Sequence, residues 1–276
     1  MIATTTPVIR IRPASGWSAL DLKSVWEYRE LAYNMVWRDI KVRYKQTVLG
    51  VSWALIQPLA SMVVFTVIFG RLAQLPSEGV PYPVFTLAAL LPWQLFTSGF
   101  TGAANSVAGN ASVISKVYFP RLIIPIAAVA ATIVDFTISL ILLAALMLWY
   151  GVSVSGNVIF FPVFVVMALL SAFAAGLWTA ALNVKYRDVR YVLPYLQQLW
   201  LFASPVVYSI TLVPERYQSI YALNPMVSVI QGFRWALFGG QSPWGLMGGS
   251  LVITLVLLIG GLFYFRRAEE EFSDFI

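Results

Sequence analysis

Long stretches without charged side chains restrict this chain more than any other feature. A helix needs about 20 consecutive apolar residues to cross the hydrocarbon core of a bilayer, and the sequence offers six such stretches, one of them interrupted by Asp135. The predicted spans are residues 48–70, 81–105, 122–150, 157–184, 192–210 and 244–265. Only 11% of the residues are charged, against about 25% in soluble domains, so we predict an all-α integral membrane protein with six transmembrane helices.

The basic residues predict the orientation of these spans. Fifteen of the 18 Lys and Arg fall in segments that six spans would place on the same side as the N-terminus. Cytoplasmic loops carry the excess of Lys and Arg in membrane proteins, and residues 1–30 lack the apolar core of a signal peptide. We therefore expect both termini in the cytoplasm, with residues 1–30 as an N-terminal segment, 50–266 as the transmembrane domain and 267–276 as a tail. The three basic residues on the other side are Arg71, Arg216 and Arg234.

Absent residue types exclude several kinds of chemistry. The chain has no cysteine and no histidine, so disulfides, thiolate or imidazole metal ligands, cysteine nucleophiles and histidine bases are excluded. A membrane enzyme such as a glycosyltransferase would need clustered carboxylates or histidines near an interface, and the acids here are scattered. The net charge of +6 is typical of cytoplasmic loops that meet anionic lipid. We thus expect membrane lipids, and no nucleic acid, among the partners.

An amphipathic helix is predicted over residues 31–49, directly before the first span. At 100° per residue its apolar side chains share one face and its cations an adjoining one. The apolar face consists of Tyr33, Val36, Trp37, Ile40, Tyr44 and Val48. The basic sector consists of Arg38, Lys41 and Lys45. Such a helix lies in the membrane interface, either as a simple anchor or as a surface for a cytoplasmic partner. Gly50 supplies a bend after it, and Pro58 should kink the first span.

Six segments carry a resemblance to a known family. They are, in chain order, RDIKVRYKQTVLGVSWALIQP (38–58), LPWQLFTSGF (91–100), SVISKVYFPRLIIP (112–125), NVKYRDVRYVLP (183–194), SPVVYS (204–209) and YALNPM (221–226). Together they resemble the membrane subunits of type 2 ABC exporters for polysaccharides, which move O-antigen, capsule or teichoic-acid chains. The resemblance covers nearly the whole chain from about residue 30, and the combination is specific because the segments occur in the family's order.

The resemblance implies a permease subunit that forms a homodimer around a central conduit in the bacterial inner (plasma) membrane. Two copies of a separate cytoplasmic ABC ATPase would drive it, and its cargo would be a lipid-linked polysaccharide. The loop at residues 110–120 matches the family's coupling helix, and the amphipathic helix matches the interface helix that lies against the same ATPase. The candidate ATPase-coupling residues are Arg38, Lys41, Arg43, Lys45, Ser112, Ser115, Lys116, Tyr118 and Arg121. No cofactor is expected on this chain. ATP and Mg²⁺ would be held by the partner, since the sequence has no G-x-x-x-x-G-K-[ST] phosphate loop.

Polar and aromatic residues inside the spans are candidates for a role in transport. The candidate conduit-lining residues are Gln57, Trp93, Phe96, Ser98 and Phe100. Their rings would either stack on sugar faces or pack between helices, the more frequent role. Asp135 is the only ionisable residue inside a predicted span. Its neighbours Thr132, Thr137 and Ser139 are expected to help satisfy it, so a structural hydrogen bond between helices is preferred to a proton relay.

Two further segments have open interpretations. Residues 211–243 contain three prolines and three charges and are too broken for a span. Either short re-entrant helices on the extracytoplasmic side, before the last span, or an ordinary structured loop fits them. The cluster after the fourth span consists of Tyr186, Arg187, Asp188 and Arg190. These residues either fix helix ends or contact the ATPase.

Two other transport functions are the main alternatives. The closest is a type 2 ABC permease for another cargo, a drug or a lipid, although the large insertions that would favour it are absent. The second is an ion-coupled secondary transporter, which would show inverted repeats and paired intramembrane ion ligands. The two halves of the chain show no convincing repeat, and the lone Asp135 is poor support for ion coupling.

Overall fold

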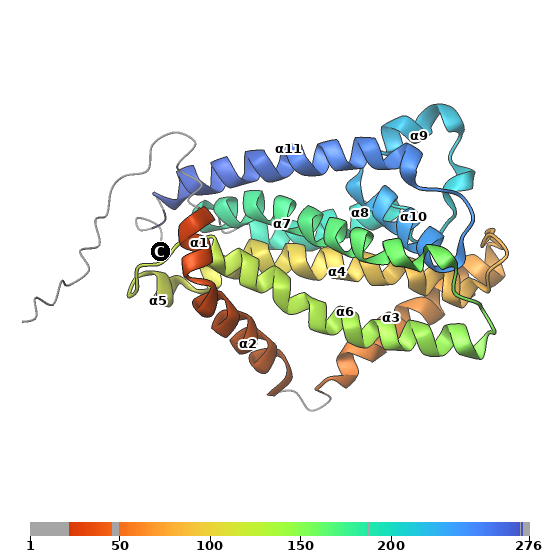
Figure 1. The fold of residues 1–276 in the computed structure, drawn as a ribbon, viewed down its shortest axis with the longest axis horizontal. Helices are drawn as coiled ribbons and strands as arrows, with labels where there is room; N and C mark the ends of the chain where they lie inside the picture. The colour runs from red at the N-terminus through yellow and green to blue at the C-terminus, as the bar shows by residue number, and fades with distance from the viewer. Residues whose placement is uncertain (1–21, 46–49, 187, 271, 273–276) are drawn as a thin grey trace, which may run out of the picture.

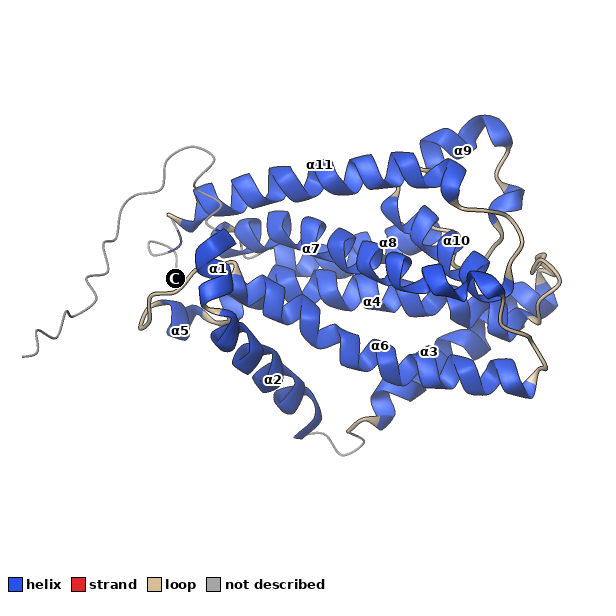
Figure 2. Ribbon diagram, in the orientation of Figure 1, coloured by secondary structure: helices blue, strands red, loops and turns tan. Residues whose placement is uncertain are grey.

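The computed structural model describes residues 22–45, 50–186, 188–270 and 272. Within these residues every regular element is a helix (Figure 1, Figure 2), which confirms the all-α fold class. The α-helices are α1 (Leu22–Glu27), α2 (Arg29–Lys45), α3 (Ser52–Phe65), α4 (Tyr82–Gly109), α5 (Ala111–Ile114), α6 (Ile123–Trp149), α7 (Phe161–Lys185), α8 (Val189–Phe202), α9 (Glu215–Tyr221), α10 (Pro225–Phe238) and α11 (Trp244–Glu269). The others are a π-helix, η2 (Thr66–Leu72), and two 3-10 helices, η3 (Gly156–Phe160) and η4 (Ile210–Leu212). Val48, Arg187 and the last four residues of the predicted tail lie outside the described residues.

In the described part of the chain, five helical stretches are long and apolar enough to cross a membrane. They are Ser52–Leu72, Tyr82–Gly109, Ile123–Trp149, Gly156–Lys185 and Trp244–Glu269. They coincide with five of the six predicted spans. The remaining prediction, residues 192–210, differs from the structure because α8 ends at Phe202 after 14 residues. A helix of that length rises about 21 Å, which is less than the roughly 30 Å of a hydrocarbon core.

Helix α4 is the centre of the bundle. It packs against α3, α6, α7, α8 and α10, and 78% of its most apolar stretch is buried. Small residues allow this close packing: a methyl group added at Gly176 of α7 would lie 2.5 Å from the Cβ of Ala103 in α4. Membrane helices commonly use such small residues to bring two backbones together.

The stretch formed by α3 and η2 is the opposite case. Only 11% of the most apolar part of residues 52–72 is buried. These residues lie along the edge of the bundle beside α6 (Figure 1). Pro58 lies inside α3 as predicted. Before it, Gly50 adopts a φ of 46°, a conformation that side chains disfavour, so the predicted use of this glycine to turn the chain is confirmed.

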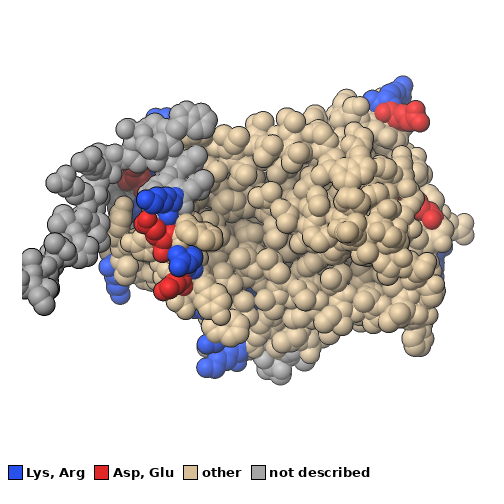
Figure 3. Space-filling view, viewed as in Figure 1, with Lys and Arg blue, Asp and Glu red and all other residues tan. Residues whose placement is uncertain are grey.

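The charged residues gather at the two ends of the bundle. One end collects α1, α5 and the last turn of α11, whereas the other carries α9 and the loops that follow η2 and α6 (Figure 1). Figure 3 shows a broad belt without charged side chains between the two ends. Three described parts of the segments predicted to be cytoplasmic, α1, α5 and the last turn of α11, therefore share one end of the molecule.

Residues 211–243 form two short helices, α9 and α10. Every residue of α10 up to Leu237 is buried, including Arg234, which is 1% exposed. Its guanidinium donates hydrogen bonds to the carbonyl oxygens of Pro205 (2.8 Å), Val206 (2.9 Å) and Tyr208 (3.1 Å). These carbonyls belong to the irregular segment after α8, where Pro205 has no N–H to continue a helix. The buried arginine thus stabilises the break in the predicted fifth span.

Candidate functional site

The loop at residues 110–120 is a connection at the α1 and α5 end of the bundle, with five exposed residues in a row of seven. It consists of the four-residue helix α5 and an irregular turn. Ser112, Ser115, Lys116 and Tyr118, four of the predicted coupling residues, are exposed, and Tyr118 is 73% accessible. We call residues 112–118 the coupling segment. Its exposed tyrosine and lysine leave it available to a partner protein.

The residues that follow the coupling segment are fixed to the bundle. Phe119 and Ile123, which follow the coupling segment, form a hydrophobic cluster with Met35 of α2. The main-chain N–H of Arg121 donates to Glu269 Oε1 of α11 at 3.2 Å, and its guanidinium donates to the Glu269 carbonyl. Arg121, a predicted ATPase contact, therefore lies half-buried and engaged within the chain. Displacing the coupling segment must strain its contacts with both α2 and α11.

Helix α2 has one residue buried against the bundle and two exposed apolar side chains. Met35 is its buried residue, whereas Tyr33 is 68% exposed and Trp37 49% exposed. These two side chains belong to the apolar face predicted to enter the membrane interface, and they point away from the protein, whereas Met35 packs against residues around the start of α6. The predicted basic sector remains exposed at Arg38, Lys41 and Lys45.

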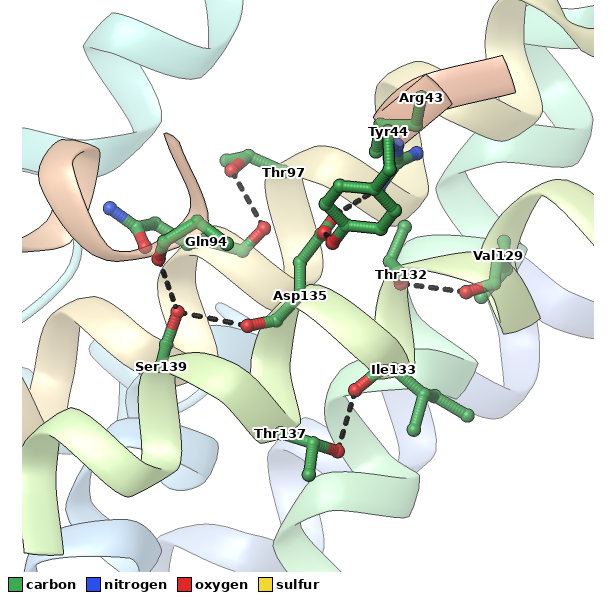
Figure 4. A network of polar contacts seen from close by, with 11 residues as sticks. Arg43, Tyr44, Gln94, Thr97, Val129, Thr132, Ile133, Asp135, Thr137 and Ser139 are labelled. Carbon is green, nitrogen blue, oxygen red and sulfur yellow. Dashed lines mark hydrogen bonds and ion pairs between the residues drawn. The ribbon is translucent and has the colours of Figure 1, made fainter. Parts of the chain in front are cut away.

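The carboxylate of Asp135 is held by α2. The Arg43 guanidinium and the Tyr44 hydroxyl both donate to it, as Figure 4 shows. The expected partners Thr132, Thr137 and Ser139 instead donate to carbonyl oxygens of their own helix, at 2.6, 2.8 and 2.9 Å. Asp135 therefore makes a hydrogen bond between helices, as preferred from the sequence, but its partners are Arg43 and Tyr44 of the helix before the first span.

Asp135 lies level with the start of α3. Ser139, one turn after it, also donates to the Ala54 carbonyl oxygen at 3.0 Å, and Ala54 is in the first turn of α3. The 21 residues of α3 and η2 are just sufficient to cross a hydrocarbon core. The carboxylate thus lies near one end of this span, although it is in the middle of α6 in sequence.

A polar cavity of about 290 Å³ lies between α2, α3, α4 and α6. We call it the Asp135 cavity. Its polar and aromatic lining residues include Arg43, Tyr44, Trp53, Gln57, Gln94, Thr97, Ser98, Thr132, Asp135, Phe136 and Ser139. Two of the predicted conduit-lining residues, Gln57 and Ser98, are among them.

The three predicted conduit aromatics form a packed cluster instead. Trp93, Phe96 and Phe100 of α4 are buried, and Trp200 of α8 meets Phe96 edge to face with 4.9 Å between ring centroids. Such ring pairs contribute roughly 0.5–1.5 kcal/mol beyond burial. These rings therefore pack between helices in the described protomer, and their lining of a conduit stays a prediction.

The polar network around Arg234 was not predicted from the sequence. It also includes Glu78, which accepts a hydrogen bond from Ser209, and Tyr82, which donates to the Val207 carbonyl. The available signal was an arginine inside the otherwise uncharged run VSVIQGFRWALF. No group of three acidic residues that could hold a metal ion occurs among the residues described.

Known proteins similar to this chain form a consistent set. Residues 30–238 match the protein family described as "ABC-2 type transporter". The chain is 31% identical over 260 residues to the O-antigen export system permease protein RfbA of Myxococcus xanthus, covering 92% of this chain and 98% of that protein. It is 26% identical to the RfbA protein of Klebsiella pneumoniae, covering 87% and 92% of the two chains. It is also 26% identical to the polysialic acid transport protein KpsM of Escherichia coli, covering 84% and 91%.

Proposed function

Because the chain belongs to the ABC-2 type transporter family, we propose that it is the permease subunit of an ATP-driven exporter for a lipid-linked polysaccharide. The relatives named above are permeases or transport proteins for O-antigen and polysialic acid. The observation that carries the proposal is the coupling segment, which is exposed and is followed directly by residues fixed to α2 and α11. The chain itself acts as a transport subunit and not as an enzyme.

The coupling segment is the proposed docking site of a cytoplasmic ABC ATPase. Lys116 and Tyr118 are exposed there, and tyrosines are frequent energetic anchors of protein interfaces. A displacement of this segment would be transmitted to α2 by the packing of Phe119 against Met35, and to α11 by the hydrogen bond from Arg121 to Glu269. Two copies of the ATPase, holding ATP and Mg²⁺, would act on two copies of this subunit.

The exposed apolar face of α8 supports the homodimer. Tyr191, Tyr195, Leu199 and Phe202 are exposed along it, and in a membrane such a face contacts lipid or another protein. A second copy meeting the first there would enclose a conduit between protomers. Both termini would be cytoplasmic in the bacterial inner membrane, since the basic segments share one end of the molecule.

Purification in mild detergent, without cross-linker, tests the proposal. We expect a near-equimolar ABC ATPase in the preparation and ATP hydrolysis by the purified complex. The double variant Lys116→Ala and Tyr118→Ala should lower the amount of bound ATPase about tenfold, as the loss of an interface anchor does. The control is Tyr150→Ala, at an exposed tyrosine beyond the other end of α6.

A preparation free of ATPase, or ATPase binding that the double variant leaves unchanged, would contradict this assignment. If ATP hydrolysis depends on the coupling segment but no polysaccharide reaches the outer side, the protein is a permease of this family for another cargo.

A further inference from the structure

We propose that the Asp135 cavity binds one neutral sugar unit of the exported chain. This inference rests on the proposed function for the source of the sugar. The cavity itself is defined by four helices, α2, α3, α4 and α6. Its charge, its unused polar groups, its size and its level in the bundle each restrict the ligand.

The charge of the cavity favours a neutral ligand. Among the described lining residues, the charged ones are Arg43 and Asp135, and they form an ion pair with each other. An anion such as a phosphate would meet the Asp135 carboxylate and compete for the one guanidinium. A cation would likewise displace Arg43 from its partner. Separating a partly buried ion pair is costly, so a ligand without charge fits the cavity best.

The polar groups that remain unused match hydroxyl groups. Within the described part of the chain, the side chains of Gln57, Gln94 and Ser98 make no hydrogen bond to another residue, yet all three line the cavity. A carboxamide offers both donors and an acceptor, and a hydroxyl offers both in one atom. Sugar hydroxyls are also donors and acceptors at once. Trp53, which is 53% exposed, adds an apolar ring against which the face of a sugar can lie.

Size and position limit the ligand to a single unit at the membrane boundary. The volume of about 290 Å³ is at the small end of the roughly 300–1,000 Å³ typical of small-molecule sites. The cavity lies at the level where α3 begins, beside the end of α2. A lipid-linked sugar chain carries its first polar units at this level, while the lipid tail stays in the hydrocarbon core. A bound sugar would contact Arg43 and Tyr44, and therefore the helix that also packs behind the coupling segment.

Protection of an introduced cysteine tests this inference. The chain contains no cysteine, so the full-length Ser98→Cys variant carries a single thiol in the cavity wall. Its labelling rate by a small methanethiosulfonate reagent is measured in phosphatidylcholine nanodiscs. The probes are the methyl glycosides of glucose, galactose, mannose, rhamnose and N-acetylglucosamine, with glycerol and glycerol 3-phosphate for comparison. At twice the Kd of a binding sugar, labelling should slow about threefold, because only the free protein reacts.

Two matched variants separate a cavity site from a general effect of sugar. Ser115→Cys, in the exposed coupling segment, should label at the same rate with and without every probe. In the Ser98→Cys protein, the added change Gln94→Leu should raise the Kd of the protecting sugar about tenfold, the effect of losing one to two hydrogen bonds. At the same sugar concentration, labelling should then slow only about 1.2-fold. The same change at Gln198, which is exposed on α8 outside the cavity, should leave protection unchanged.

Three results would overturn the inference: no glycoside protects Ser98→Cys, glycerol 3-phosphate protects equally well, or Gln94→Leu has no effect on protection. The second result would identify a phospholipid headgroup site. None of these measurements requires ATP or a partner protein. If the sugars give no protection but the protein forms a complex with an ATPase, only the proposed sugar site is contradicted. If the sugars protect the thiol but the protein binds no ATPase, the proposed function as an ATP-driven exporter is contradicted, and the sugar site remains.

Discussion

The guanidinium of Arg43 donates to the carboxylate of Asp135, 92 residues later in the chain. The pair joins the helix before the first span to the middle of α6, and Tyr44 adds a second hydrogen bond to the same carboxylate. Since Met35 joins α2 to the residues after the coupling segment, α2 contacts the rest of the protomer at both the coupling end and the Asp135 cavity.

Removing either partner of this pair should destabilise the protein. Asp135→Asn and Arg43→Gln should each cost about 1–2 kcal/mol, because each leaves a partly buried charge without its partner. A change of about 1 kcal/mol corresponds to a Tm shift of about 2–4 °C in a chain of this size. Thermal unfolding in nanodiscs measures both single variants and the double variant. The double variant should be more stable than the sum of the single effects predicts, and strict additivity would show that the two side chains do not interact.

Replacing Arg234 should have a larger effect. Lysine cannot reproduce the planar fork that serves the carbonyls of Pro205, Val206 and Tyr208. We expect Arg234→Lys to cost at least about 3 kcal/mol, since at least two buried carbonyls lose their donor. Arg216→Lys is the matched control, at an exposed site on α9, and should stay within about 0.5 kcal/mol of the parent. Equal stability of the two variants would contradict the role assigned to Arg234.

A side chain at Gly176 should separate α4 from α7. The added methyl of Gly176→Ala would overlap the Cβ of Ala103, so we expect a loss of about 1–3 kcal/mol from overpacking. The same substitution at Gly248 in α11 meets no atom within 4 Å and should be neutral or stabilising by up to about 1 kcal/mol. Denaturation midpoints of both variants measure the difference, and a harmless Gly176→Ala would mean that the two helices can move apart.

The orientation in the membrane can be tested with single cysteines. Ser77 lies in the loop after η2, and Ser115 lies in the coupling segment at the other end of the bundle. In intact cells an impermeant thiol reagent should label Ser77→Cys and leave Ser115→Cys unlabelled until the membrane is opened. The reverse pattern would invert the topology and place the coupling segment out of reach of a cytoplasmic ATPase.

Hydropathy was sufficient to predict the five long helices, because a membrane span is a local property of about 20 residues. The partner of Asp135 was not predictable in the same way, since the charges of Arg43 and its neighbours indicate only an interfacial helix. The end of α8 at Phe202 also depends on tertiary structure. Residues 192–210 are uncharged, Pro205 alone is compatible with a kinked span, and the carbonyls after α8 are satisfied by the distant Arg234. For Trp93, Phe96 and Phe100, the sequence left two roles open, and the structure adds the ring contacts that these residues make within one protomer.

The contrast between α4 and the α3–η2 stretch has a mechanical consequence. Helix α4, with 78% of its most apolar stretch buried, resists displacement, because moving it would disturb the packing of the core. The α3–η2 stretch, buried over only 11% of its most apolar stretch and ending in a wider π-helical winding, can tilt at the cost of few contacts. The subunit therefore combines a rigid central helix, α4, with a more easily displaced helix at the edge of the bundle, the α3–η2 stretch. If a conduit beside this subunit widens and narrows as successive cargo units pass, we expect the α3–η2 stretch to move while α4 stays in place.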